Sequence, residues 1–270
     1  MKLAWRELLR RPGRFGTATV ILLLIALLLM FLGGLVDGLI ANSTGAVRAQ
    51  SGEGIVFSAT ARDSFLRSRI EPALRTRIEA VPGVSKVGGI GIVQLGARLP
   101  GKGLRDLVDV ALFGTELPPK GVPGIPATGE AYADRVLQEQ GVTKGMTIVL
   151  GPARSAIKVI GFVDDTNYLG QGAMWANPTT WRSVLSANRP GEMMADGVFQ
   201  SLIVVGDGHD PKALRSHIDA ATNGLTTTLS VAQAASVIPG VKEQKGTFGQ
   251  IIAVTLAIAL SPSNDTIQNL

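Results

Sequence analysis

The chain has 270 residues, of which 46% are hydrophobic, 17% charged and 5% aromatic, and its mean hydropathy of +0.28 is high for a soluble domain. This length allows one large domain or two small ones. The formal net charge is +5, but five basic residues and one acidic residue place +4 of it in residues 1–14, so no basic groove for nucleic acid is implied. Cysteine is absent, which excludes disulfides, iron–sulfur clusters and cysteine-bound zinc.

Residues 1–14 are expected to be a cytoplasmic basic leader that forms an amphipathic helix in the headgroup layer, with Trp5 at the interface. The alternative is that these cations are only a topology signal. An uncharged run follows over residues 15–36; as a helix it would be roughly 33 Å long, enough for a bilayer core. A cleaved signal peptide is the other interpretation, but the apolar part of a signal peptide is shorter than this run.

We therefore predict a transmembrane helix over residues 15–37. The cations before it place the N-terminus in the cytoplasm, and the main domain, residues 38–245, on the outer side. Residues 248–260 form a second apolar run, too short to span a bilayer, followed by a polar tail. We expect residues 246–260 to be a partial second transmembrane helix and residues 261–270 a tail from a truncated or frameshifted end; a buried helix is the alternative.

The main domain is expected to be α+β, a mixed body rich in turns, because glycine and proline are frequent without a period. Apolar spacing, caps and turn residues predict its elements. Helices are expected over residues 72–80, 130–140, 177–185 and 210–221, and an amphipathic segment over 231–241. Strands are expected over residues 84–99, 107–113, 147–150, 157–163, 200–205 and 226–229. Residues 200–229 would form one βαβ-like unit.

Chemical motifs are largely absent from the sequence. It contains no P-loop, nucleophile elbow, zinc-protease motif or EF-hand loop, and Gly88-Gly89-Ile90-Gly91 lacks the dinucleotide-binding spacing. His209 and His217, the only histidines, are expected to be solvated rather than metal ligands.

Other candidate groups also favour structural roles. Asp164 and Asp165 are adjacent in a turn, where side chains usually point apart, so acid–base catalysis is disfavoured. Of Trp175 and Trp181, we expect one buried anchor and one surface residue. Asn42-Ser43-Thr44 matches a glycosylation sequon, which has meaning only in a eukaryotic secretory route. No catalytic, cofactor or metal residue is assigned, and the chain is not expected to be an enzyme.

The order of these parts resembles the FtsX/MacB-type permeases of ABC transporters, and the DevC-like group in particular. RRPGRF at residues 10–15 is similar to that family's entry to its first helix, and IEAVPGV at 78–84 to its helix–strand junction. The segments GEAYADRVLQEQGVTKGMTIVLG at 129–151 and KVIGFVDD at 158–165 resemble its outer-domain core, and VKEQKGTF at 241–248 the approach to its second helix. The family continues beyond this point with three further helices and a coupling loop.

The resemblance implies a permease subunit in a bacterial inner membrane with a MacB-like core domain outside. A separate cytoplasmic ATPase subunit would drive it, and the permease would form a homodimer or heterodimer, in some members with an outer adaptor protein. Its role would be export or mechanotransmission, without a cofactor of its own and without nucleic acid. The alternative function is a membrane-anchored extracytoplasmic binding or adaptor protein, which gives no reason for the second apolar run.

Overall fold

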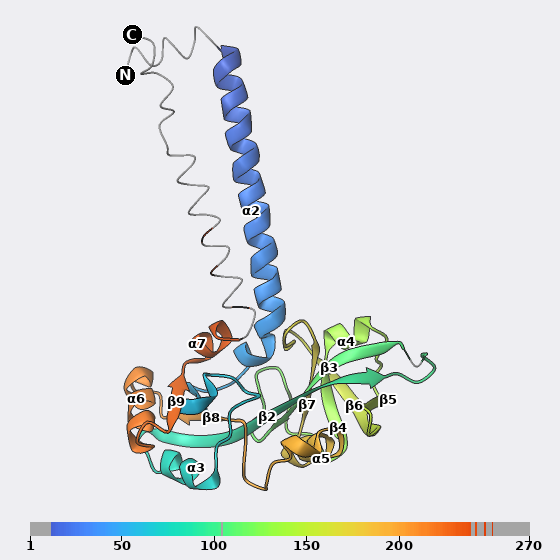
Figure 1. The fold of residues 1–270 in the computed structure, drawn as a ribbon, viewed down its shortest axis with the longest axis vertical. Helices are drawn as coiled ribbons and strands as arrows, with labels where there is room; N and C mark the ends of the chain where they lie inside the picture. Colours follow the sequence, from blue (N-terminus) through green and yellow to red (C-terminus); the bar gives the residue numbers. More distant parts are fainter. Residues whose placement is uncertain (1–11, 104, 239–240, 242–245, 247–249, 251–270) are drawn as a thin grey trace. The chain divides into compact units, whose positions relative to one another are not determined.

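The computed structural model describes residues 12–103, 105–238, 241, 246 and 250 (Figure 1). The expected leader therefore lies mostly outside the described residues, and so do the second apolar run and the tail, apart from residues 246 and 250. Contacts divide the chain into two units, one containing residues up to Ile40 and one spanning Ala41–Lys242.

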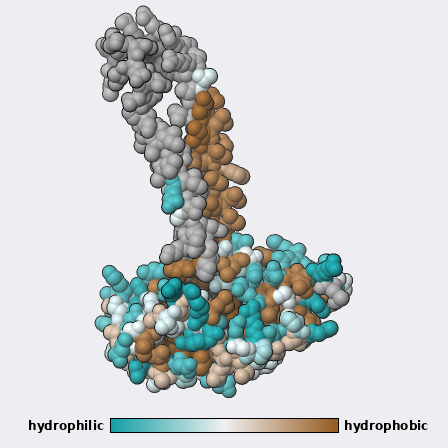
Figure 2. Space-filling model, in the orientation of Figure 1, coloured by the Kyte–Doolittle hydropathy of each residue, from teal (hydrophilic) through white to brown (hydrophobic). Residues whose placement is uncertain are grey.

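Helix α2 covers Pro12–Arg48, a single helix of 37 residues and about 55 Å. Within it, Thr19–Arg48 is long and apolar enough to cross a membrane, and its most apolar stretch has a mean hydropathy of 2.9. Leucine, isoleucine and phenylalanine side chains along this stretch are exposed, and Figure 2 shows them as a continuous apolar surface on α2. By length and composition alone, this stretch qualifies as a candidate membrane span.

The globular unit contains one nine-stranded sheet, in the order β3-β7-β4-β6-β5-β2-β8-β1-β9, with β3 also paired to β2. The mixed α+β class expected for this domain is therefore confirmed. The strands are β1 (Gly54–Ser58), β2 (Val84–Arg98), β3 (Leu107–Thr115), β4 (Glu130–Asp134), β5 (Thr147–Leu150), β6 (Ser155–Val163), β7 (Gly172–Ala176), β8 (Ser201–Gly206) and β9 (Thr226–Leu229). The helices are α3 (Pro72–Glu79), α4 (Arg135–Glu139), α5 (Pro178–Asn188), α6 (Pro211–Ala221) and α7 (Val231–Ser236), with 3₁₀ turns η1 (Ala59–Ala61) and η2 (Pro190–Glu192).

Strand pairings close six of these strands into a small barrel. From Ile90 onward β2 pairs with β3, and the circuit continues through β7, β4, β6 and β5 back to β2. Alternate residues of all six strands join one buried cluster, as expected for the interior of a barrel. Several of them are alanines, which suits a narrow interior.

Two helices close the ends of this barrel. Leu137 of α4 occupies the space that a Cβ on Gly172 would need, 2.3 Å away. At the other end Trp181 of α5 lies on the paired glycines Gly91 and Gly114, where added Cβ atoms would come within 2.1 and 2.3 Å of its ring. The glycine run in β2 thus makes room for side chains rather than for a nucleotide.

The remaining strands form a layer, β8-β1-β9, joined to the first half of β2. Residues Val84–Ile90 pair with β8, so β2 runs through both the layer and the barrel (Figure 1). β8, α6 and β9 form the expected βαβ-like unit. β1 lies between β8 and β9 and is antiparallel to both, so β8 and β9 run parallel to each other. The free edge of β9 is covered by Asp219 of α6, which accepts hydrogen bonds from the Thr228 amide at 3.2 Å and hydroxyl at 2.6 Å.

One predicted element is wrong, and the strands β1 and β7 were not predicted. The expected helix over residues 130–140 is instead β4 followed by α4, because Asp134 caps the helix by accepting from the Val136 amide at 2.9 Å, and the residues before it pair with β6 and β7. β7 was not predicted as a strand or as a helix. It has five residues, too few for a periodic signal, and it is buried on both faces.

Candidate functional site

The best-defined functional candidate is the junction between the end of α2 and the loop that joins β6 to β7. We call this loop, residues 164–171, the strap. The α2 residues concerned, 42–48, belong to the globular unit, and Thr44, Ala46 and Val47 are almost completely buried there. The last two turns of α2 are therefore part of the packing of the globular unit.

Backbone hydrogen bonds join α2 to the strap. Asn167 accepts from the Ala46 amide at 2.9 Å, the Leu169 amide donates to Ser43 at 3.0 Å, and the Gly170 amide donates to Asn42 at 3.3 Å. The side-chain amide of Asn167 also donates to that of Asn42. These contacts are made at several points along one face of the helix, so the strap holds both its position and its rotation.

Gly45 permits this close approach. A Cβ at this position would lie 2.6 Å from the Asn167 Oδ1, 2.7 Å from the Asp165 carbonyl oxygen and 3.0 Å from the Asn167 nitrogen. By contrast, a Cβ on Gly34 or Gly38 of the same helix would meet nothing within 4 Å. The glycine is therefore required by the strap and not by the helix.

Asp164 and Asp165 point in different directions, toward two different arginines. Asp165 Oδ1 lies 2.7 Å from Nη2 of Arg48, in the last turn of α2. Asp164 forms a bidentate pair with Arg135 of α4, and the hydrogen bond from this guanidinium lowers the pKa of Asp164 below its usual 3.8. Both pairs are solvent-exposed, so each contributes little stability, but together they connect α2 to the barrel through the strap.

A buried carboxylate fixes the strap to the barrel. Asp134, 1% exposed at the end of β4, accepts from both the amide and the hydroxyl of Thr166, each at 2.7 Å, while it also caps α4. Asp165 and Leu169 keep left-handed backbone, with φ of 54° and 52°. Non-glycine residues hold such angles only where surrounding contacts determine them, and these hydrogen bonds supply those contacts.

A row of aromatic rings lies beneath the strap. Tyr168 meets Phe113 of β3 edge-on at 5.5 Å and Phe65 at 6.4 Å; Phe113 in turn stacks on Trp175 at 4.6 Å, and Phe65 packs against Phe57 at 4.9 Å. Burial raises the pKa of Tyr168 to about 12. The strap is thus anchored by a buried aromatic side chain as well as by polar contacts.

The expectation of one surface tryptophan is wrong. Trp175 and Trp181 are both fully buried, the first in the aromatic row and the second at the end of the barrel. Sequence reasoning also did not identify the strap as a site. Its only signal was the polar stretch DDTN followed by Tyr, Leu and Gly, which indicates an ordinary turn until the partners on α2 and β4 are known.

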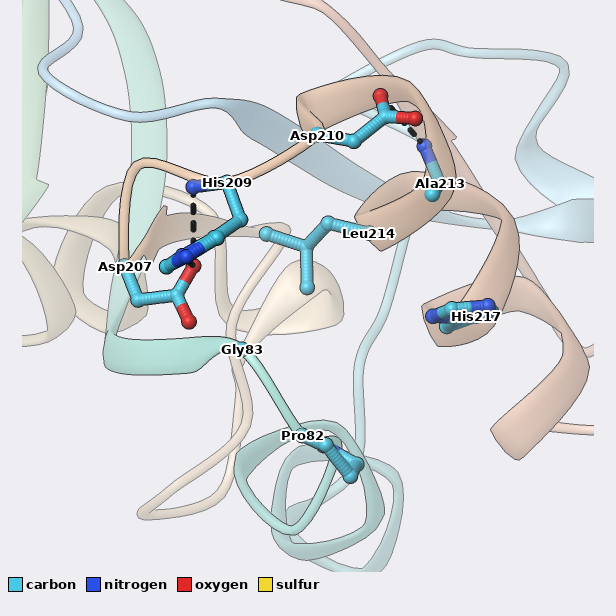
Figure 3. Close-up of a pocket in the computed structure, with 8 residues that line it drawn as sticks. All are labelled: Pro82, Gly83, Asp207, His209, Asp210, Ala213, Leu214 and His217. Carbon is cyan, nitrogen blue, oxygen red and sulfur yellow. Dashed lines mark hydrogen bonds and ion pairs between the residues drawn. The ribbon is translucent and has the colours of Figure 1, made fainter.

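The two histidines line a shallow pocket of about 310 Å³ between α6 and the turn at Pro82-Gly83 (Figure 3). His209 is solvent-exposed, and its backbone N–H and ring hold the pKa of Asp207 below its usual value; the Asp207 Oδ1 lies 3.1 Å from each. Asp210 caps α6, and the Ala213 and Lys212 amides lower its pKa. Among the described residues, no group of three or more histidine and acidic side chains could hold a metal ion.

No protein-family model matches the chain, and no curated protein matches it. Among solved structures, it is similar to the periplasmic region of MacB from Actinobacillus actinomycetemcomitans, with a TM-score of 0.46 and 10% identity over 69% of this chain and 92% of that one. It is also similar to the extracellular domain of the ABC-type transporter YknZ from Gram-positive bacteria, with a TM-score of 0.44 and 13% identity over 66% of this chain and 98% of that one.

Proposed function

We propose that the chain is the membrane-spanning subunit of an ABC-type transporter, in which α2 passes movement between a cytoplasmic ATPase subunit and the extracytoplasmic globular domain. The observation that carries this proposal is that α2 continues as one helix from an apolar stretch of membrane-spanning length to turns bonded to the strap. Such a helix can transmit a shift or rotation that a flexible linker would absorb. The resemblance to FtsX/MacB-type permeases supports the same role.

In this proposal the subunit performs no chemistry itself. ATP binding and hydrolysis take place in the partner, and this chain converts them into movement of its outer domain, for export or for control of another outer protein. The basic residues of the leader favour a cytoplasmic N-terminus and an outer globular domain. The assembly would be a dimer of permease subunits with two ATPase subunits, as the resemblance implies.

The orientation can be tested directly because the natural chain contains no cysteine. Lys102→Cys, at the exposed β2–β3 turn, and Lys2→Cys, in the leader, are labelled in intact cells with a membrane-impermeant maleimide. We expect Lys102→Cys to be labelled without lysis and Lys2→Cys only after lysis. Labelling of both, or the reverse pattern, would exclude the proposed topology.

The coupling is tested by extracting the full gene product from its native membrane and asking whether an ATPase subunit co-purifies with it. We expect an ATP-hydrolysing subunit whose rate depends on this chain after reconstitution in lipid. If the topology is correct and no ATPase associates, the chain is a membrane-anchored binding or adaptor protein instead.

A further inference from the structure

We propose that the layer and the barrel move as one rigid body, so that movement of the last turns of α2 carries the whole globular unit without bending it. This inference rests on the function proposed above and specifies how the outer domain responds to the membrane helix. The two parts are held together where β2 passes from one to the other, by what we call the junction residues: Arg75, Glu116, Leu117, Phe199 and Gln200.

The end of α2 is joined to both parts. On the barrel side it is hydrogen-bonded to the strap. On the layer side the chain continues through residues 49–53 into β1, and the Glu53 amide donates to Val204 of β8 at 2.9 Å. The loop that follows β3 adds a third connection, since the Lys120 amide donates to the Ala49 carbonyl at 2.7 Å. A shift of α2 therefore acts on layer and barrel together.

Glu116 connects the end of β3 to the layer half of β2. Its amide donates to the Gly89 carbonyl at 3.0 Å, and its Oε2 accepts from the Gly89 amide at 2.7 Å. The same Oε2 lies 2.7 Å from Nη1 of Arg75, and Nη2 of that arginine donates to the Val87 carbonyl at 3.2 Å. Because Arg75 belongs to α3, one carboxylate joins the barrel strand β3, the layer half of β2 and the helix that packs on it.

Side chains from outside β2 fill the space next to its two adjacent glycines. A Cβ on Gly88 would lie 2.4 Å from the Leu117 Cγ. A Cβ on Gly89 would lie 2.3 Å from the ring of Phe199, which is 1% exposed and stacks at 6.1 Å on Trp181 at the end of the barrel. A close-packed interior has low compressibility and transmits displacement. A bend of β2 at these glycines would have to displace both side chains.

Gln200 continues the hydrogen bonding of β2 beyond the end of β8. The last pair between these two strands joins Ile90 to Ser201. Gln200, which is fully buried, precedes Ser201 in the chain, and its Oε1 accepts from the Ile92 amide. Ile92 pairs on its other side with Phe113 of β3. The step from layer to barrel therefore has hydrogen-bonding partners on both edges of β2.

The test is a distance measurement by pulsed electron paramagnetic resonance on the full chain in lipid nanodiscs. Spin labels are attached at Lys144→Cys, before the barrel strand β5, and at Lys212→Cys, on the helix α6 that packs on β9 of the layer. Both lysines are exposed, and the natural chain has no cysteine. Labelled chains are diluted with unlabelled ones, so that only distances within one chain are measured. We expect one narrow distance distribution, and a broad or two-peaked distribution would overturn the proposal.

A matched pair of variants tests the junction residues in the labelled chain. Glu116→Ala and Glu79→Ala each remove one carboxylate partner of Arg75, but Glu116 also accepts from the Gly89 amide. We expect Glu116→Ala to broaden the distance distribution and to raise hydrogen exchange at the Gly89 amide about tenfold, and Glu79→Ala to change neither. A distribution that both variants leave unchanged, or that both broaden equally, would show that the junction contacts do not hold the two parts together.

Addition of ATP distinguishes a failure of this inference from a failure of the proposed function. With the co-purified ATPase present, we expect ATP to leave the distance between positions 144 and 212 unchanged while ATP is hydrolysed. A distance that changes with ATP would refute the rigid body and leave the proposed function intact. If no ATPase associates, the proposed function fails, and the distance distributions of the natural background and the two variants still decide whether the unit is rigid.

Discussion

Gly45 is the position at which α2 comes closest to the strap, and replacing it with alanine gives a measurable test of that contact. An added Cβ would lie 2.7 Å from the Asp165 carbonyl oxygen and 3.0 Å from the Asn167 nitrogen, both backbone atoms that cannot rotate away. Overpacking of this kind costs about 1–3 kcal/mol. In an open helical position the same change is favourable by up to about 1 kcal/mol, because alanine is the better helix former.

Gly38→Ala supplies that reference, since its Cβ meets nothing within 4 Å. The two variants are therefore expected to differ by about 1–3 kcal/mol in the free energy of opening the strap, with Gly45→Ala the less stable. The assay is the exchange rate of the Leu169 and Gly170 amides, which donate to α2, measured on the full chain in lipid. Protection equal in both variants would mean that the close approach at Gly45 does not hold the strap.

Three further predictions concern the domain around the strap. Asp134→Ala leaves both donors of Thr166 without their buried acceptor and is expected to lower the free energy of unfolding by about 3 kcal/mol, measured by urea denaturation. Gly91→Ala should lower the free energy of unfolding by about 1–3 kcal/mol, because the added Cβ would lie 2.1 Å from the Trp181 ring. Trp181→Leu should lower it less when Gly91→Ala is already present than in the natural chain. If the two effects simply add, the two residues do not pack as described. The folded pKa of Tyr168 is raised from 10.0 to about 12, so its contribution to stability is complete below pH 10 and is lost as the pH rises toward 12. Tyr168→Phe should therefore reduce the loss of thermal stability at alkaline pH. A pH dependence that the variant leaves unchanged would refute this reasoning.

The sequence by itself determined the elements whose signals are local. The uncharged run predicted the span-length helix, although α2 extends to Arg48 because its last turns pack in the globular unit. Asn177 before Pro178 and Asp210 before Pro211 predicted the starts of α5 and α6, and both side chains do cap those helices. The long strands β2 and β3 were also predicted, because their apolar patterns extend over many residues.

Only the tertiary structure decided the barrel, the burial of both tryptophans and the strap. β4 and β7 are five residues each, and they become strands because their neighbours complete their hydrogen bonds. Gly91 of β2 is explained only by its contact with Trp181, a residue about ninety positions away in the sequence. The strap depends on contacts between residues more than a hundred positions apart, such as Asn42 with Asn167, and such contacts leave no periodic or local pattern in a single sequence.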